Sequence, residues 1–161
     1  DSEYRMQFSL WCLAGTPLIM GSDIRNMPPQ MEDLLLNKEL IAINQDPECR
    51  PPYLVGKRSV MVPEENTNEA VEPLRMVKDK LLTFIKHLSN QEFAIAYYNL
   101  HEEEQKMHCI FADVGLPYAS GYGFDMTDIF TGEHIGIKRD YHVISVPGHD
   151  CRLFRCRLAK Q

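Results

Sequence analysis

The stretch FSLWCLAGTPLIMGSDIRNMPPQMEDLLLNKELIAINQDP, residues 8–47, decides which fold this chain can adopt. Its first part predicts a helix, because Tyr4, Phe8 and Trp11 fall on one helical stripe and further apolar residues fill a second stripe. Gly15 ends that helix. The helix is apolar over most of its circumference, so we expect other elements to cover it on more than one side.

A short apolar run, PLIMG at residues 17–21, follows the helix. It is too short for a helix and shows no alternation, which is typical of a strand buried on both faces of a parallel sheet. Pro28 and Pro29 then begin a second, leucine-rich helix that ends at Pro47. One helix–strand–helix unit supplies no parallel neighbour for its strand, so we expect residues 1–47 to be the end of a larger α/β domain.

The sequence changes in character after residue 47. Residues 53–62 contain two short strand-like runs, and residues 63–73, PEENTNEAVEP, predict an exposed acidic loop. From Leu81 onward apolar residues alternate and turn residues recur at short intervals, which predicts an antiparallel β-sandwich over residues 48–161. The residues expected in its core are Phe93, Ile95, Tyr97, Phe154 and Cys156.

Four motifs of the first 47 residues resemble the end of the catalytic barrel in glycoside hydrolase family 27, which contains α-galactosidases and α-N-acetylgalactosaminidases. They are FSLW, PLIMG, DIR and the run NKELIAINQDP, with weaker colinear matches at residues 128–133 and 146–155. The resemblance implies that residues 1–47 are the last helix, strand and helix of a (β/α)8 barrel and that residues 48–161 are a C-terminal β-sandwich. The expected fold class is therefore mainly β with an α/β N-terminal piece. Pro28 departs from the family, which commonly has a small hydroxyl residue at this position.

The family resemblance also implies where the chemistry lies. A retaining glycosidase uses two carboxyl groups about 5 Å apart, and the resemblance places both aspartates upstream of Asp1, so we assign no catalytic residue here. Asp23 and Arg25 follow the predicted strand, at the barrel end that faces the active site. They either support a catalytic carboxylate or form an ion pair that holds the loop. Asn44 and Asp46 are expected to cap the helix end and tie the barrel to the sandwich.

Charge and composition exclude several classes of partner. The net charge is -6 and no basic cluster occurs, so we expect no nucleic-acid partner and no binding to an acidic membrane surface. No apolar run approaches the roughly 18 residues of a membrane span. We expect no cofactor and no metal. His149, Cys151 and Cys156 match no usual zinc spacing, and the two cysteines would point to opposite faces of a strand.

The cysteines bear on the cellular location. The chain has 5 of them, scattered along its length, which favours reduced thiols and a cytosolic protein. Secretion stays an alternative, because a signal peptide would precede Asp1. Cys12 and Cys109 are expected to be small core residues.

Two classes of function remain. The first is the C-terminal part of an exo-acting hydrolase that removes terminal α-galactosyl residues. The barrel would bind the α-galactoside, and this segment would be purely structural. Whether the enzyme accepts a hydroxyl or an N-acetyl group at C2 of the sugar stays open. The apolar segment that contains Trp11, Leu13, Leu18 and Ile19 would then be exposed unless other protein surface buried it. We expect this segment to pack on the sandwich, to pair with a second copy or to be disordered. The second class is a non-catalytic β-sandwich module that is structural or binds carbohydrate. Its sugar-stacking candidates are Tyr97, Tyr98, Tyr118, Tyr122 and Tyr141.

Overall fold

The computed structural model describes residues 2–21, 23–63 and 74–160. Three helices lie at the N-terminal end: α1 (Ser2–Ala14), α2 (Pro29–Leu35) and α3 (Lys38–Asn44). Helix α1 ends at Gly15, whose φ of +70° suits a residue without a side chain. The prediction of a single second helix is wrong, because α2 ends at Leu35 and the next helix begins only at Lys38. Asn37 then caps α3 by accepting hydrogen bonds from the N–H groups of Glu39 and Leu40.

The strand expected at residues 17–21 is also wrong. This run belongs to neither sheet of the described chain, and its side chains are largely exposed, with Ile19 at 82%. A strand needs a neighbour for its backbone hydrogen bonds, and the described residues offer none beside this run. The segment is therefore an extended connection between α1 and α2.

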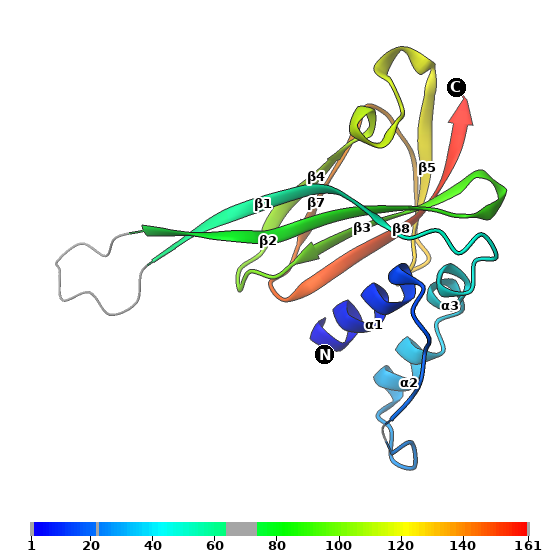
Figure 1. The fold of residues 1–161 in the computed structure, drawn as a ribbon, viewed down its shortest axis with the longest axis vertical. Helices are drawn as coiled ribbons and strands as arrows, with labels where there is room; N and C mark the ends of the chain where they lie inside the picture. Colours follow the sequence, from blue (N-terminus) through cyan, green and yellow to red (C-terminus); the bar gives the residue numbers. More distant parts are fainter. Residues whose placement is uncertain (1, 22, 64–73, 161) are drawn as a thin grey trace.

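The rest of the described chain is an antiparallel two-sheet sandwich, as predicted (Figure 1). Six strands form the large sheet in the order β1-β2-β3-β8-β5-β6, and β4 pairs with β7 in the second sheet. The bounds are β1 (Tyr53–Pro63), β2 (Leu74–His87), β3 (Glu92–Asn99), β4 (Gln105–Ile110), β5 (Tyr122–Asp128), β6 (His134–Lys138), β7 (Tyr141–Val146) and β8 (Asp150–Lys160). Three short 3-10 helices, η1 (Ser89–Gln91), η2 (Phe111–Val114) and η3 (Tyr118–Ser120), lie between strands.

Of two predictions for the β1–β2 region, one differs from the structure and the other falls almost entirely on residues that the structure does not describe. Residues 53–62 form one strand with two register shifts against β2, at Leu54/Gly56 and Arg58/Val60, where two separate runs were expected. The expected acidic loop at residues 63–73 lies, except for Pro63, outside the described residues. The domain boundary expected at residue 47 falls in the turn between α3 and β1.

The large sheet carries a hydrophobic core on each of its faces. One core lies between the two sheets and includes Ile95, Phe154 and Cys156. The other lies between the large sheet and the helices, and contains Cys12 and Leu13 of α1, Leu40 and Ile43 of α3, and Cys151 and Leu153 of β8. Figure 1 shows α1 and α3 lying along the large sheet, with β4 and β7 on its other side. Central strand β8 therefore faces an apolar layer on both sides.

Most of the predicted core residues are buried. Ile95, Tyr97, Phe154 and Cys156 are at most 1% exposed, and Cys12 and Cys109 are buried as expected. Phe93 is only partly buried, because it lies at the margin of the inter-sheet core against the rings of His87 and Phe124. Cys151 and Cys156 lie in different cores, which confirms that they point to opposite faces of β8.

Candidate functional site

Asp23 and Arg25 form a local ion pair in the connection between α1 and α2. The Asp23 carboxylate accepts hydrogen bonds from the Arg25 backbone N–H at 3.0 Å and from Arg25 Nη2 at 2.7 Å. Both side chains are exposed, at 83% for Arg25 and 58% for Asp23. The hydrogen bonds from Arg25 lower the pKa of Asp23, whereas the acid of a glycosidase needs a raised pKa. The geometry is that of an ion pair that shapes the loop, and a supporting role beside a catalytic carboxylate stays a prediction.

Asn44 and Asp46 lie where the helical segment meets the sandwich. Asn44 Nδ2 donates to the carbonyl of Thr16 at 2.8 Å, which ties α3 to the residue that follows the end of α1. The Asp46 carboxylate accepts hydrogen bonds from the backbone N–H and the hydroxyl of Ser89, at the turn between β2 and β3. Burial by itself would raise the pKa of Asp46, but these bonds, with a third from the N–H of Glu48 and the charge of Lys86, lower it. The two predicted junction residues therefore connect three elements.

Lys86 of β2 completes this junction and was not predicted. Its side chain is fully buried, and its Nζ donates to the carbonyl of Ile43 at 3.0 Å, in the last turn of α3. Burial lowers the pKa of Lys86, while the nearby Asp46 carboxylate acts in the opposite direction. An ammonium group at a helix C-terminus is favourable because it meets the unpaired carbonyls and the negative end of the helix dipole. The sequence signal was the single Lys86 within the apolar run LLTFIKH.

A second buried connection joins α1 to β8. Arg5 forms a bidentate ion pair with Asp150, which is only 2% exposed, and the Arg5 guanidinium lies 5.4 Å from the ring centre of Phe130. Farther along α1, the Ser9 hydroxyl lies 3.2 Å from the Tyr98 hydroxyl. None of these pairs could be predicted from the sequence, because residues more than eighty positions apart carry no local pattern that links them.

The outer face of the helical segment remains apolar and exposed. Trp11 and Ile19 are 45% and 82% exposed, whereas Leu13 is buried against the sandwich and Leu18 is partly buried. Of the three alternatives for this segment, the structure shows packing on the sandwich for one side of α1 and an exposed surface on the other. Pairing with a second copy stays a prediction. The exposed apolar residues of the segment are Tyr4, Leu10, Trp11, Ile19, Met20, Ile24 and Leu36.

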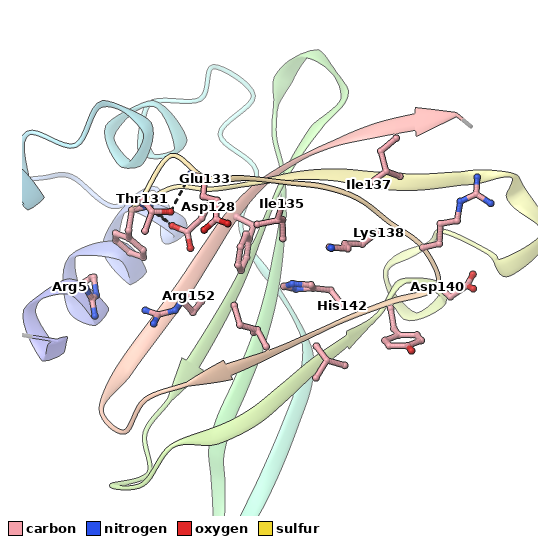
Figure 2. Close-up of a pocket in the computed structure, with 16 residues that line it drawn as sticks. Arg5, Asp128, Thr131, Glu133, Ile135, Ile137, Lys138, Asp140, His142 and Arg152 are labelled. Carbon is pink, nitrogen blue, oxygen red and sulfur yellow. Dashed lines mark hydrogen bonds between the residues drawn. The ribbon is translucent and has the colours of Figure 1, made fainter.

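A cleft of about 1080 Å³ lies between β6 and β7, where the edges of the two sheets diverge (Figure 2). Figure 2 shows Lys138 and His142 reaching into the space between these strands. At one end of the cleft, the Asp128 carboxylate accepts hydrogen bonds from the N–H groups of Phe130 and Thr131 and so holds the β5–β6 turn. The lining combines apolar, cationic and acidic groups, and comes from α1, the end of β5 with the turn that follows it, β6, β7 with the connection that precedes it, and β8.

Among residues 2–21, 23–63 and 74–160, no three His, Cys, Asp or Glu side chains are grouped so that they could hold a metal ion. None of the described helices has the length and hydropathy required to cross a membrane.

Comparison with known proteins bears directly on this fold. Residues 1–46 match the family model described as alpha galactosidase A, and residues 78–156 match the model of the alpha galactosidase C-terminal beta sandwich domain. Together the two matches cover more than half of the chain, and Asp46 at the end of the first range bonds to Ser89 in the second. The chain belongs to glycoside hydrolase family 27.

Curated family 27 relatives match nearly the whole chain. An alpha-galactosidase of Oryza sativa subsp. japonica is 27% identical over 96% of this chain and 31% of its own length. Alpha-galactosidase mel1 of Schizosaccharomyces pombe is 31% identical over 95% of this chain and 32% of its own length. An alpha-N-acetylgalactosaminidase of Mus musculus is 29% identical over 81% of this chain and 27% of its own length. The chain thus spans about a third of the length of the curated relatives that it matches.

Solved family 27 structures share the fold of this chain. Alpha-galactosidase I of Mortierella vinacea aligns with a TM-score of 0.78 and 23% identity, over 99% of this chain and 37% of the other. The alpha-galactosidase of Saccharomyces cerevisiae determined with raffinose aligns with a TM-score of 0.80 and 18% identity, over 99% of this chain and 44% of the other. At this level of identity the likeness concerns the fold alone.

Proposed function

We propose that this chain is the C-terminal part of a retaining hydrolase that removes terminal α-galactosyl residues from oligosaccharides or glycoconjugates. The observation that carries the proposal is the junction: residues matched by the catalytic-domain model are joined to the sandwich by the buried contacts of Arg5, Asp46 and Lys86. A free-standing sandwich module has no need of such contacts.

The role of this segment in the proposed enzyme is structural. The exposed apolar face of residues 1–47 is the surface on which the rest of a barrel packs, because an uncovered patch of this kind is unusual on a soluble monomer. The connection that carries Asp23 and Arg25 would then lie at the rim of the barrel, and the substrate would be bound by catalytic residues supplied from elsewhere in the barrel. The sandwich holds α1 and α3 in the arrangement that the barrel requires.

An assay of two proteins tests this proposal. The 161-residue chain alone is expected to hydrolyse no aryl α-galactoside, because losing a nucleophile removes most of the rate of a covalent mechanism. A chimera in which this chain replaces the matched C-terminal segment of the Oryza sativa alpha-galactosidase is expected to hydrolyse it. Turnover by the chain alone that survives repurification contradicts the proposal, as does a folded but inactive chimera.

The proposal includes a cytosolic location. All five cysteines are free thiols in the structure, and four of them are buried in the two cores or beside them. Thiol-trapping mass spectrometry on the protein from its native host tests this point. Five alkylated cysteines are expected, and a disulfide would favour the secreted alternative.

A further inference from the structure

The cleft between β6 and β7 has the form of a binding site. Strand β6 is the edge of the large sheet and β7 is an edge of the small sheet. They are joined through Arg139 and Asp140 and diverge from that connection, so the cleft widens towards Arg5 and Arg152 (Figure 2). Its volume of about 1080 Å³ lies slightly above the range usual for ligand pockets, about 300–1,000 Å³.

A buried polar group lies at the base of this cleft. His142 lines the cleft and is only 6% exposed, and its Nδ1 lies 3.0 Å from the hydroxyl of Tyr97, which is fully buried. Burial raises the pKa of Tyr97 and lowers that of His142 to about 4, so both are neutral at pH 7. The direction of the hydrogen bond between the Tyr97 hydroxyl and Nδ1 depends on the tautomer of His142. Since Nδ1 is occupied by Tyr97, Nε2 is the nitrogen left to serve a ligand.

The rim of the cleft offers both donors and acceptors. Lys138 and Arg139 are cationic, and Glu133 and Asp140 are acidic. Within the described part of the chain, none of these four side chains makes a hydrogen bond or an ion pair. The rim thus carries two positively and two negatively charged side chains that are free to bind a ligand. Two further cations at the wide end, Arg5 and Arg152, already face the Asp150 carboxylate.

Aromatic and apolar surface completes the lining. Tyr141 begins β7 at the narrow end of the cleft and is 60% exposed, while Phe154 packs against the His142 ring with the ring centres 5.0 Å apart. Sugars present hydroxyl groups that need paired donors and acceptors, and C–H faces that stack on aromatic rings. We propose that the cleft between β6 and β7 binds a neutral oligosaccharide, as a non-catalytic site on the sandwich.

The lining argues against the main alternative ligands. An anion would meet the carboxylates of Glu133 and Asp140, while the guanidinium groups of Arg5 and Arg152 share the Asp150 carboxylate and Asp128 is a further negative charge near Arg5. An extended peptide pairing with the edge of β6 or β7 would use backbone groups and would need neither the rim charges nor Tyr141. The proposal goes beyond the proposed hydrolase function and does not depend on it, because binding is measured on the isolated chain without turnover.

An NMR titration of the ¹⁵N-labelled 161-residue chain with raffinose, a neutral trisaccharide, tests the site. Saturable shifts are expected at the amides of residues 138–144 and 152. Tyr141→Ala is expected to weaken binding about tenfold. Tyr118→Ala is the matched control, because Tyr118 is similarly exposed, at 66%, and does not line the cleft. Both tyrosines lie on the surface, so the amide spectra of the two variants should retain the dispersion of the parent.

Three outcomes overturn the proposal. They are the absence of saturable shifts at millimolar raffinose, shifts centred outside the cleft, and equal weakening by Tyr141→Ala and Tyr118→Ala. Inorganic phosphate provides a further arm: if phosphate shifts the cleft amides and raffinose does not, the cleft is an anion site and the saccharide proposal is wrong. Hydrolysis of raffinose during the titration would contradict the proposed function and would leave the location of the shifts as a separate result.

Discussion

The Asp46 carboxylate accepts two hydrogen bonds from Ser89, each at 2.8 Å, one from the backbone N–H and one from the hydroxyl. These bonds join the end of α3 to the turn between β2 and β3, which lies 43 residues farther along the chain. Both groups of Ser89 are satisfied by one buried carboxylate, so the barrel-like segment and the sandwich meet in a defined geometry.

Asp46→Ala is expected to lower the free energy of unfolding by about 1–3 kcal/mol, because it leaves buried donors without an acceptor. Urea denaturation followed by circular dichroism measures the change. The matched control is Asp23→Ala, which removes an exposed ion pair and should change stability by less than about 1 kcal/mol. Equal effects of the two substitutions on the free energy of unfolding would show that the Asp46–Ser89 contact stabilises the fold no more than the exposed Asp23–Arg25 pair does.

Arg5→Met is expected to destabilise the chain by about 2–3 kcal/mol, because it leaves the buried Asp150 carboxylate without its bidentate partner. Amide hydrogen exchange should show the largest loss of protection in α1 (Ser2–Ala14), where Arg5 is located. Arg25→Met serves as the control, since its carboxylate partner Asp23 is exposed to water. A loss of protection spread evenly over the chain would contradict a local tether at α1.

Acidification is expected to destabilise the chain through His142. Burial and the charge of Lys138 lower the folded-state pKa of His142 to about 4, whereas the unfolded value is 6.5. Between these values the unfolded chain binds more protons, so the free energy of unfolding falls as pH decreases, by about 3 kcal/mol at most.

The measurement for His142 is urea denaturation at a series of pH values from 7 to 4. His142→Phe should flatten the dependence of stability on pH over this window, whatever its effect at neutral pH. His108→Gln, at an exposed position of the small sheet, should retain the parental slope. An unchanged slope in His142→Phe would mean that other groups carry the acid sensitivity.

Gly148→Ala is expected to destabilise the turn before β8 strongly, by about 2 kcal/mol or more, because overpacking forces the backbone to move. A Cβ atom at this position would lie 1.8 Å from the carbonyl oxygen of Glu102. Thermal unfolding monitors the change. Gly21→Ala is the matched control, since no atom lies within 4 Å of its Cβ position, and it should be neutral or slightly stabilising.

Period-two alternation predicted the sandwich correctly because it reports directly on the two faces of a strand. Ile95, Tyr97, Phe154 and Cys156 lie on the inter-sheet face of their strands, as the alternation requires. The same logic separated Cys151 from Cys156. It was less accurate for Phe93, since alternation gives the face on which a residue lies but not its distance from the margin of the sheet.

The strand expected at residues 17–21 shows the limit of local patterns. An apolar run without alternation indicates a preference for a buried environment, and a strand additionally needs neighbours for its backbone groups. The described chain has no such neighbour, so Ile19 and Met20 are exposed in an extended connection. Partners for Asn44 and Asp46 were expected, because polar residues at the end of a helix need partners or provide them. Asp46 bonds to Ser89 of the sandwich, whereas Asn44 bonds to Thr16 within the helical segment.

By itself, the sequence determined the first helix, the two faces of the sandwich strands and the resemblance to family 27, since each depends on residues that are close in the chain. Only the tertiary structure decided which distant groups meet. Lys86 reaches the end of α3, Arg5 meets Asp150, and His142 meets Tyr97, because the packing of the sheets and helices brings together residues that are far apart in the sequence. Because these polar groups are buried, leaving any of them without a partner would cost free energy. This cost favours the one arrangement in which all of them are paired, and so gives the junction its defined geometry.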